Sequence, residues 1–266
     1  MTQGTPENRP ISTRKRARWL VAIGQVASSL SMGLFPGRCA ACDEGLPWRG
    51  ADEALCETCA YALMPCEGPR CPRCGQGFIS SQAVDHVCGR CHAKPPPYDR
   101  LVSAWLYGGP ARDAILRFKL QGRPYLYKAL ARPLADLLRR EAWRPDLVLA
   151  VPMSPGGLRR RGYDPAYLLA LGLCRDLGWP SPPSGLLHKV RETKAQRGMS
   201  ASARRENVRE AYQCPENARK RLKGKAVLLV DDVVTTGATA EACVRALRRA
   251  GAARVSVVTL ARTPYD

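Results

Sequence analysis

Two adjacent carboxylates, Asp231 and Asp232, are followed by a stretch of threonine and glycine that could bind a phosphate group. They directly follow an apolar run at 225–230, which predicts a buried strand, and a helix is expected to begin at Thr239. Unpaired N–H groups at a helix N-terminus after a small-residue loop attract anions. Because acids repel phosphate, we expect the two Asp to accept hydrogen bonds from sugar hydroxyls, or to hold a Mg²⁺-bound sugar pyrophosphate through water.

Three other interpretations of this segment compete with a phosphate site. A dinucleotide-binding loop would place G-x-G-x-x-G before the acid, whereas here the acids come first. An apolar strand ending in two Asp is similar to the second motif of P-loop ATPases, but the chain has no G-x-x-x-x-G-K-[ST]. A purely structural strand–turn–helix would not need adjacent acids at a strand end. The residues therefore favour the phosphate site.

Eight of the 12 cysteines form four C-x-x-C pairs, separated by 13, 11 and 13 residues. The pairs are Cys39/Cys42, Cys56/Cys59, Cys71/Cys74 and Cys88/Cys91. Each pair supplies half of a tetrahedral Cys₄ zinc site, and four thiolates leave no open position, so we expect two structural zinc ions. The simplest assignment is sequential, with the first two pairs on one zinc and the last two on the other. An interleaved assignment stays open, as does replacement of a ligand by His86 or His92.

Cysteine usage and the N-terminal residues predict a cytoplasmic protein. Closely spaced cysteine pairs are metal ligands far more often than disulfides, and the first residues show no secretory pattern. Residues 16–34 predict a moderately amphipathic helix that is too polar, with its glycines and serines, to span a membrane. This helix could pack on the body of the protein or lie on a membrane surface.

The net charge of +19 is unevenly distributed along the 266 residues. Residues 1–36 hold five bases and one acid, residues 37–97 hold six and seven, and residues 98–266 hold 31 and 15. Such a basic C-terminal part points to a polyanionic partner, although solubility alone could also explain the charge.

Three regions follow from composition and periodicity: a basic arm at 1–36, a cysteine-rich domain at 37–95 and an α/β domain at 98–266. In the last, strands are predicted at 100–107, 147–151, 225–230 and 254–260, and helices at 110–120, 125–143, 164–177 and 239–250. Leu116 and Leu120 are expected on the apolar face of the first helix. Alternating strands and helices predict an α/β fold with a mostly parallel sheet covered on both faces.

On these motifs, the chain resembles the ComF family, which couples a double zinc ribbon to a type I phosphoribosyltransferase domain. The resemblance covers residues 35–264 and rests on the cysteine pairs, the 227–239 segment, and the shorter segments 116–119 and 160–163. It implies the type I phosphoribosyltransferase fold and phosphoribosyl pyrophosphate (PRPP) as ligand, bound with Mg²⁺.

The resemblance also implies two sets of ligand contacts. The PRPP-binding set is Asp231, Asp232, Val233, Thr235, Thr236, Gly237, Ala238 and Thr239. In the family the two Asp face the ribose hydroxyls, and residues 235–239 wrap the 5′-phosphate. The pyrophosphate and flexible-loop set is Pro152, Met153, Arg160, Arg161, Lys194 and Gln196.

The segment at 152–163 departs in part from the family pattern. Three consecutive arginines beside a glycine-rich turn suit a diphosphate, although charge alone also fits a solvated basic loop. After Gly162-Tyr163 the family has Asn-Gln, whereas this chain has Asp164-Pro165. Asp164 could instead cap the following helix, with Pro165 at its first position.

Two functions remain open from the sequence. ComF proteins are associated with the uptake of transforming DNA, so the resemblance implies a PRPP-binding protein that acts in uptake or processing of single-stranded DNA, with DNA-uptake proteins as partners. Two zinc–thiolate sites would make the cysteine-rich domain acidic, so the basic C-terminal domain should contact the DNA. The alternative is a Mg²⁺-dependent phosphoribosyltransferase of nucleobase salvage, for which no acceptor pocket or general base can be recognised.

Overall fold

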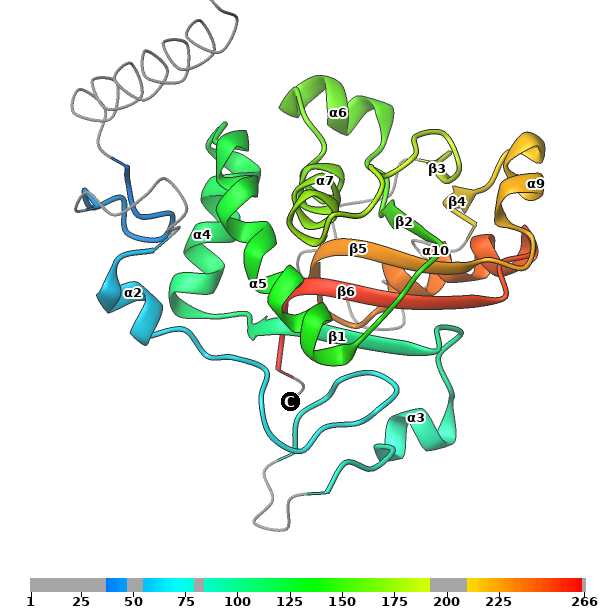
Figure 1. Ribbon diagram of the computed structural model, residues 1–266, viewed down its shortest axis with the longest axis horizontal. Coiled ribbons are helices and arrows are strands. Elements are labelled where there is room, and N and C mark those ends of the chain that lie inside the picture. The colour runs from blue at the N-terminus through cyan, green and yellow to red at the C-terminus, as the bar shows by residue number, and fades with distance from the viewer. Residues whose placement is uncertain (1–36, 47–54, 79–83, 192–209, 265–266) are drawn as a thin grey trace, which may run out of the picture.

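A computed structural model describes residues 37–46, 55–78, 84–191 and 210–264 (Figure 1). The helix expected at 16–34, and the segment with Lys194 and Gln196, lie outside the described residues. Among the described helices, none has both the length and the apolar composition needed to cross a bilayer.

A four-stranded parallel sheet forms the centre of the fold, in the order β1-β6-β5-β2. The strands are β1 (Arg100–Leu106), β2 (Leu147–Ala150), β5 (Ala226–Val234) and β6 (Arg254–Arg262). The two central strands are almost continuously apolar and buried, as strands covered on both faces must be. The parallel sheet expected from the alternation of elements is confirmed.

Helices cover both faces of this sheet (Figure 1). On one face lie α4 (Gly109–Leu120), α5 (Tyr127–Glu141) and α7 (Pro165–Leu177), and α10 (Ala238–Arg249) packs on the other. Leu130 and Leu134 of α5 and Leu169 of α7 are fully buried in the first layer. Successive residues of β5 alternate between the layers, with Leu228 facing α5 and α7 and Leu229 facing α10.

Three expectations about these elements were wrong in detail. The strand predicted to end at residue 230 continues to Val234, because its parallel pairing with β6 continues that far, so both acids lie within the strand. The glycine-rich turn before the arginines is the helix α6 (Pro155–Arg161), which begins at the cap Ser154. Leu120 is 66% exposed, because the stripe formed by Ala111, Ala114, Ile115 and Phe118 faces the core.

Smaller elements complete the fold. A 3₁₀ turn, η1 (Pro124–Leu126), precedes α5, and η2 (Glu216–Ala218) and α9 (Arg219–Leu222) precede β5. A short antiparallel hairpin joins β3 (His188–Lys189) to β4 (Tyr212–Gln213). The cysteine-rich head, meaning the described residues of 37–95, contains the short helices α2 (Glu57–Tyr61) and α3 (Gly89–Ala93).

The head protects the outer edge of β1 (Figure 1). Three backbone hydrogen bonds of 2.8–2.9 Å join the head to this strand. The Cys66 N–H donates to the Ala104 carbonyl, the Leu106 N–H to the Met64 carbonyl, and the Leu101 N–H to the Arg73 carbonyl. An open strand edge invites pairing with other chains, and these hydrogen bonds satisfy it. The head is thus an integral part of the fold.

A buried carboxylate fixes the head to the helical layer. Glu141, at the end of α5, accepts from Arg70 of the head and from Arg100 of β1, each at 2.6 Å, and its side chain is 8% exposed. Two cations on one buried carboxylate satisfy it more fully than a single partner would.

Candidate functional site

The two acids of β5 lie at the carboxyl end of the sheet, where parallel α/β folds bind ligands. Asp232 is 8% exposed and forms a 2.6 Å ion pair with Lys119, at the end of α4. The Asp231 carboxylate accepts from the N–H of Asp232 at 2.9 Å. Asp231 is paired in register with Thr259 of β6.

Burial raises the pKa of Asp231 above the usual range of a carboxyl, and the neighbouring Asp232 charge raises it further. The charge of Lys119 acts in the opposite direction. Two carboxylates this close disfavour simultaneous ionisation. The site therefore favours a ligand that brings a cation, or hydroxyl donors, to the pair.

Two cavities meet at Asp231 and Lys119. The larger, about 670 Å³, is lined by Pro152, Met153, Arg160, Arg161, Asp164 and Lys189 among others. The smaller, about 290 Å³, is lined by Val233, Thr235, Gly237, Ala238, Thr239 and Thr259 among others. Asp231 and Lys119 line both cavities. Together the cavities could hold a ligand with an anionic group at each end and polar groups between.

The smaller cavity borders the N-terminus of α10. Gly237 is the N-cap of this 12-residue helix and has a φ of +81°, a conformation that favours glycine. The Thr236 hydroxyl accepts from the N–H of Ala238 at 3.4 Å, and the Thr236 carbonyl accepts from Arg90 of the head at 2.7 Å. Backbone N–H groups and threonine hydroxyls in this arrangement can cradle a phosphate.

The larger cavity borders the α6–α7 turn. Gly162 ends α6 with a φ of +82°, and Asp164 caps α7 by accepting from the N–H of Tyr167 at 3.1 Å, with Pro165 at the first position. This confirms the capping role expected for Asp164-Pro165. Asp164 also accepts from the N–H of Met153 at 3.0 Å, and burial raises the pKa of its carboxyl.

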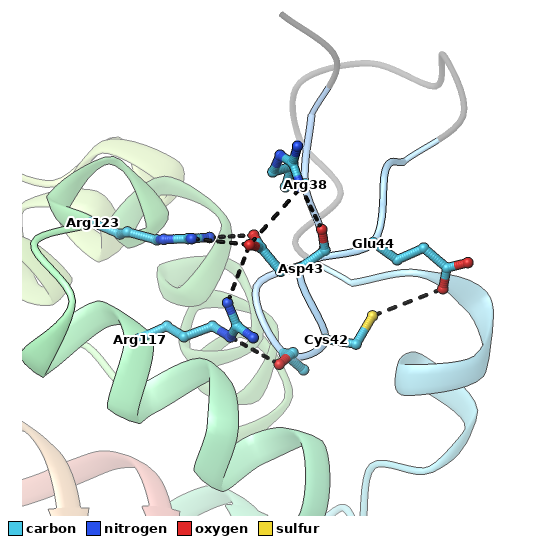
Figure 2. A network of polar contacts seen from close by, with 7 residues as sticks. Arg38, Cys42, Asp43, Glu44, Arg117 and Arg123 are labelled. Carbon is cyan, nitrogen blue, oxygen red and sulfur yellow. Dashed lines mark hydrogen bonds and ion pairs between the residues drawn. The ribbon is translucent and has the colours of Figure 1, made fainter.

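Contacts on both sides fix the end of α4, which carries Lys119. The Tyr163 hydroxyl donates to the Phe118 carbonyl, and Arg117 donates to the Ala41 carbonyl of the head at 3.0 Å. Figure 2 shows Arg117 and Arg123 converging on the carboxylate of Asp43, which follows the Cys39–Cys42 pair. Hydrogen bonds from Arg123 lower the pKa of Asp43 below its usual range. The first cysteine pair is therefore anchored to α4 through Arg117, two residues before Lys119.

The eight cysteines form two groups, each with all its sulfur atoms within 4.8 Å of one another. One group holds Cys39, Cys42, Cys56 and Cys59, and the other holds Cys71, Cys74, Cys88 and Cys91. The Sγ atoms of Cys42 and Cys56 are 3.7 Å apart, and those of Cys74 and Cys88 are 3.8 Å apart. Zinc bound tetrahedrally at about 2.3 Å from sulfur requires an S···S separation of about 3.8 Å, so the thiols fit this metal.

This grouping confirms the sequential assignment, and neither histidine belongs to a group. His86 stacks on Phe78, with ring centroids 3.9 Å apart. When bound, zinc supplies cross-links between cysteine pairs and no reaction chemistry, because all four ligand positions are filled by thiolates.

The structure brings the expected residues of 152–161 and 231–239 to adjoining cavities, except Thr236, which lines neither. Two lysines were not among the expected site residues. Lys119 could have been suspected from the helix end at 116–119, whereas Lys189 lies in a two-residue strand that carries no recognisable signal.

Comparison with known proteins identifies the class. Residues 123–266 match the phosphoribosyl transferase domain family, and residues 30–92 match the double zinc ribbon domain. The protein thus combines a type I phosphoribosyltransferase fold with a cysteine-rich double zinc ribbon.

Relatives that span nearly the whole chain narrow the family further. The chain is 33% identical over 237 residues to competence protein F of Haemophilus influenzae, covering 87% of this chain and 99% of that protein. It is 34% identical over 235 residues to DNA utilization protein YhgH of Salmonella typhimurium, with 86% and 98% covered. It is 26% identical over 215 residues to competence protein ComFC of Streptococcus pneumoniae, with 80% and 90% covered. The chain belongs to the ComF family.

The zinc grouping predicts a specific metal content. Elemental analysis should return two zinc per chain, and the double variant Cys42→Ser/Cys56→Ser should keep one, because both residues belong to one group. Cys66→Ser, outside both groups, is the control and should keep two. Loss of both zinc ions from the double variant would support the interleaved assignment instead.

The raised pKa of Asp231 predicts that its ionisation destabilises the ligand-free fold. This loss of folding free energy is absent below the unfolded-state pKa of about 4 and develops as pH rises toward the folded-state pKa. Asp231→Asn should therefore raise the melting temperature at pH 8 by about 2–4 °C, corresponding to roughly 1 kcal/mol, and leave it unchanged at pH 3.5. The exposed Asp113→Asn is the matched control. Equal melting curves for wild type and Asp231→Asn at pH 8 would contradict the burial argument.

Proposed function

We propose that the protein binds PRPP with Mg²⁺ across the two adjoining cavities. The observation that carries this proposal is that Asp231 and Lys119 line both cavities, with cations in one and a helix N-terminus in the other. PRPP has a 5′-phosphate at one end of a ribose and a pyrophosphate at the other, which matches this division.

Each group of residues has its own part in this proposal. Thr235, Thr236, Gly237, Ala238 and Thr239, together with Val233, hold the 5′-phosphate, and Asp231 and Asp232 face the ribose hydroxyls. Arg160 and Arg161 neutralise the pyrophosphate beside Pro152 and Met153. Mg²⁺, which Asp231 and Asp232 could hold through water, would neutralise part of the pyrophosphate charge. Lys194 and Gln196, which lie outside the described residues, complete the proposed pyrophosphate set.

We further propose that the PRPP-binding protein handles single-stranded DNA in the cytoplasm during DNA uptake, together with DNA-uptake proteins. The names of its relatives, competence protein F and DNA utilization protein, support this role. The basic helix α6 supplies Arg159, Arg160 and Arg161. The exposed rings of Tyr125 and Tyr167 follow residues of the larger cavity wall, by three positions after Gly122 and by one after Ala166. Positive charge beside exposed rings suits a single strand, whose bases can stack on them.

PRPP with Mg²⁺ should raise the melting temperature of the protein. At a ligand concentration of 100 times the Kd, binding stabilises by about 2.7 kcal/mol. The double variant Asp231→Asn/Asp232→Asn should lose this shift, because each amide keeps one neutral acceptor oxygen in place of two charged ones and adds an NH₂ donor that faces the hydroxyls. Asp113→Asn/Asp136→Asn removes the same charge from exposed positions and should keep the shift. An undiminished shift in the first variant would refute the site.

Single-stranded DNA should bind with an affinity that falls steeply with salt. Replacing Arg159, Arg160 and Arg161 by Ala should reduce the log–log salt slope by about two, since each lost phosphate contact contributes about 0.7. The control replaces three arginines that are more than half exposed: Arg112, Arg175 and Arg219. Fluorescence anisotropy of a labelled oligonucleotide measures the slope, and an equal decrease in both variants would argue against α6 as the binding surface.

A further inference from the structure

Arg90 lies between the second ribbon and the loop at the N-terminus of α10. The second ribbon is the head segment that carries the Cys71/Cys74 and Cys88/Cys91 pairs, and residues 235–239 are the phosphate loop. Arg90 lies between Cys88 and Cys91 in sequence, and its guanidinium donates to the Thr236 carbonyl at 2.7 Å. A cysteine pair held by metal would therefore also hold the arginine that contacts the loop.

The contact fixes the orientation of one peptide group in the phosphate loop. In a planar trans peptide the carbonyl and the following N–H point in opposite directions. Holding the Thr236 carbonyl toward the ribbon thus directs the Gly237 N–H away from it. Gly237 lines the smaller cavity and caps α10, and its left-handed conformation leaves this peptide unsupported by helical hydrogen bonding. The same hydrogen bond from Arg90 occupies the Thr236 carbonyl oxygen, which would otherwise repel an anion.

The other cysteine pair of the second ribbon is connected, through β6, to the residue before the loop. Arg262, 2% exposed at the end of β6, donates to the Cys74 carbonyl at 2.5 Å. It is paired in register with Val234, the residue before the loop, and the next N–H, that of Thr263, donates to the Val234 carbonyl at 3.0 Å. One cysteine pair thus contacts the start of the loop through β6, and the other contacts its middle through Arg90.

The geometry points to Arg90 as a positioning residue, through which metal in the second ribbon and an anion in the phosphate loop stabilise one another. The cross-link between the two cysteine pairs keeps Arg90 and the end of β6 at a fixed separation. The first residues of the loop run from Val234, beside β6, to Thr236, beside Arg90. Coupling between two binding sites is reciprocal, so a ligand bound in the loop must also raise the affinity of the second ribbon for its metal. The inference rests on the proposed binding of PRPP in this loop.

The experiment measures PRPP affinity by calorimetry and zinc release to a colorimetric chelator, both at constant Mg²⁺. Arg90→Ala should weaken PRPP binding roughly fivefold, the low end of typical coupling, because the contact is exposed. Arg90→Lys, which can still donate to the carbonyl, should recover part of the affinity. Arg245→Ala is the matched control. Arg245 and Arg90 line a third cavity, of about 70 Å³, and Arg245 forms an ion pair with Glu241 of its own helix at 3.3 Å.

The zinc measurement tests the same coupling from the metal side. PRPP should slow the release of one of the two zinc ions from the wild type and from Arg245→Ala, but not from Arg90→Ala. Equal PRPP affinity in wild type and Arg90→Ala, with unchanged zinc release, would overturn the inference and leave the proposed function intact.

Failure of the wild type to bind PRPP is a different result and overturns the proposed function. In that case the rate of zinc release, measured without ligand, still tests whether the Arg90 contact links the ribbon to the loop. Faster loss of one zinc from Arg90→Ala than from Arg245→Ala supports the link between ribbon and loop, and equal rates overturn it.

Discussion

The ion pair between Lys119 and Asp232 is the contact on which the site depends. Two neighbouring carboxylates at the end of a buried strand are costly to keep ionised without a nearby cation. Lys119 supplies that cation only because the end of α4 is held in place, by Tyr163 on one side and by Arg117 and the head on the other. The position of Lys119 in the site therefore depends on contacts made by the helical layer and by the segment of the first cysteine pair.

The head contributes to the fold in ways that a loosely tethered zinc ribbon would not. The buried hydrophobic side chains of its described residues are four cysteines and two alanines, so metal must supply much of its stability. It covers the edge of β1 with backbone hydrogen bonds and forms ion pairs with the domain at Asp43 and Glu141. Removing the head to study the basic domain alone would expose a strand edge, leave Arg117 and Arg123 without Asp43, and leave Glu141 without Arg70. The full chain therefore suits functional work.

Elements with strong periodicity were predictable from the sequence. Most strands and long helices of the α/β domain appear within two residues of their expected limits, because apolar residues at a period of 3.6, or in continuous runs, are required by burial. Helix α6 was missed because Pro155, Gly156 and Gly157 have low helix propensity, and the Ser154 cap with the Gly162 terminus compensates only in context. The length of β5 was underestimated because its last residues, two acids among valines, are held by pairing with β6.

The sequence by itself determined the α/β class, the cysteine pairs and the residue types of the phosphate loop, because each depends on local spacing or local backbone chemistry. The tertiary structure alone decided how these parts meet: Lys119 against Asp232, the sequential grouping of the sulfurs, and Arg90 against Thr236. These contacts join residues separated by 14 to 146 positions, and no local pattern encodes such a pairing. They form because parallel strands bring their carboxyl ends to one edge, and because the head must cover the adjacent edge of β1.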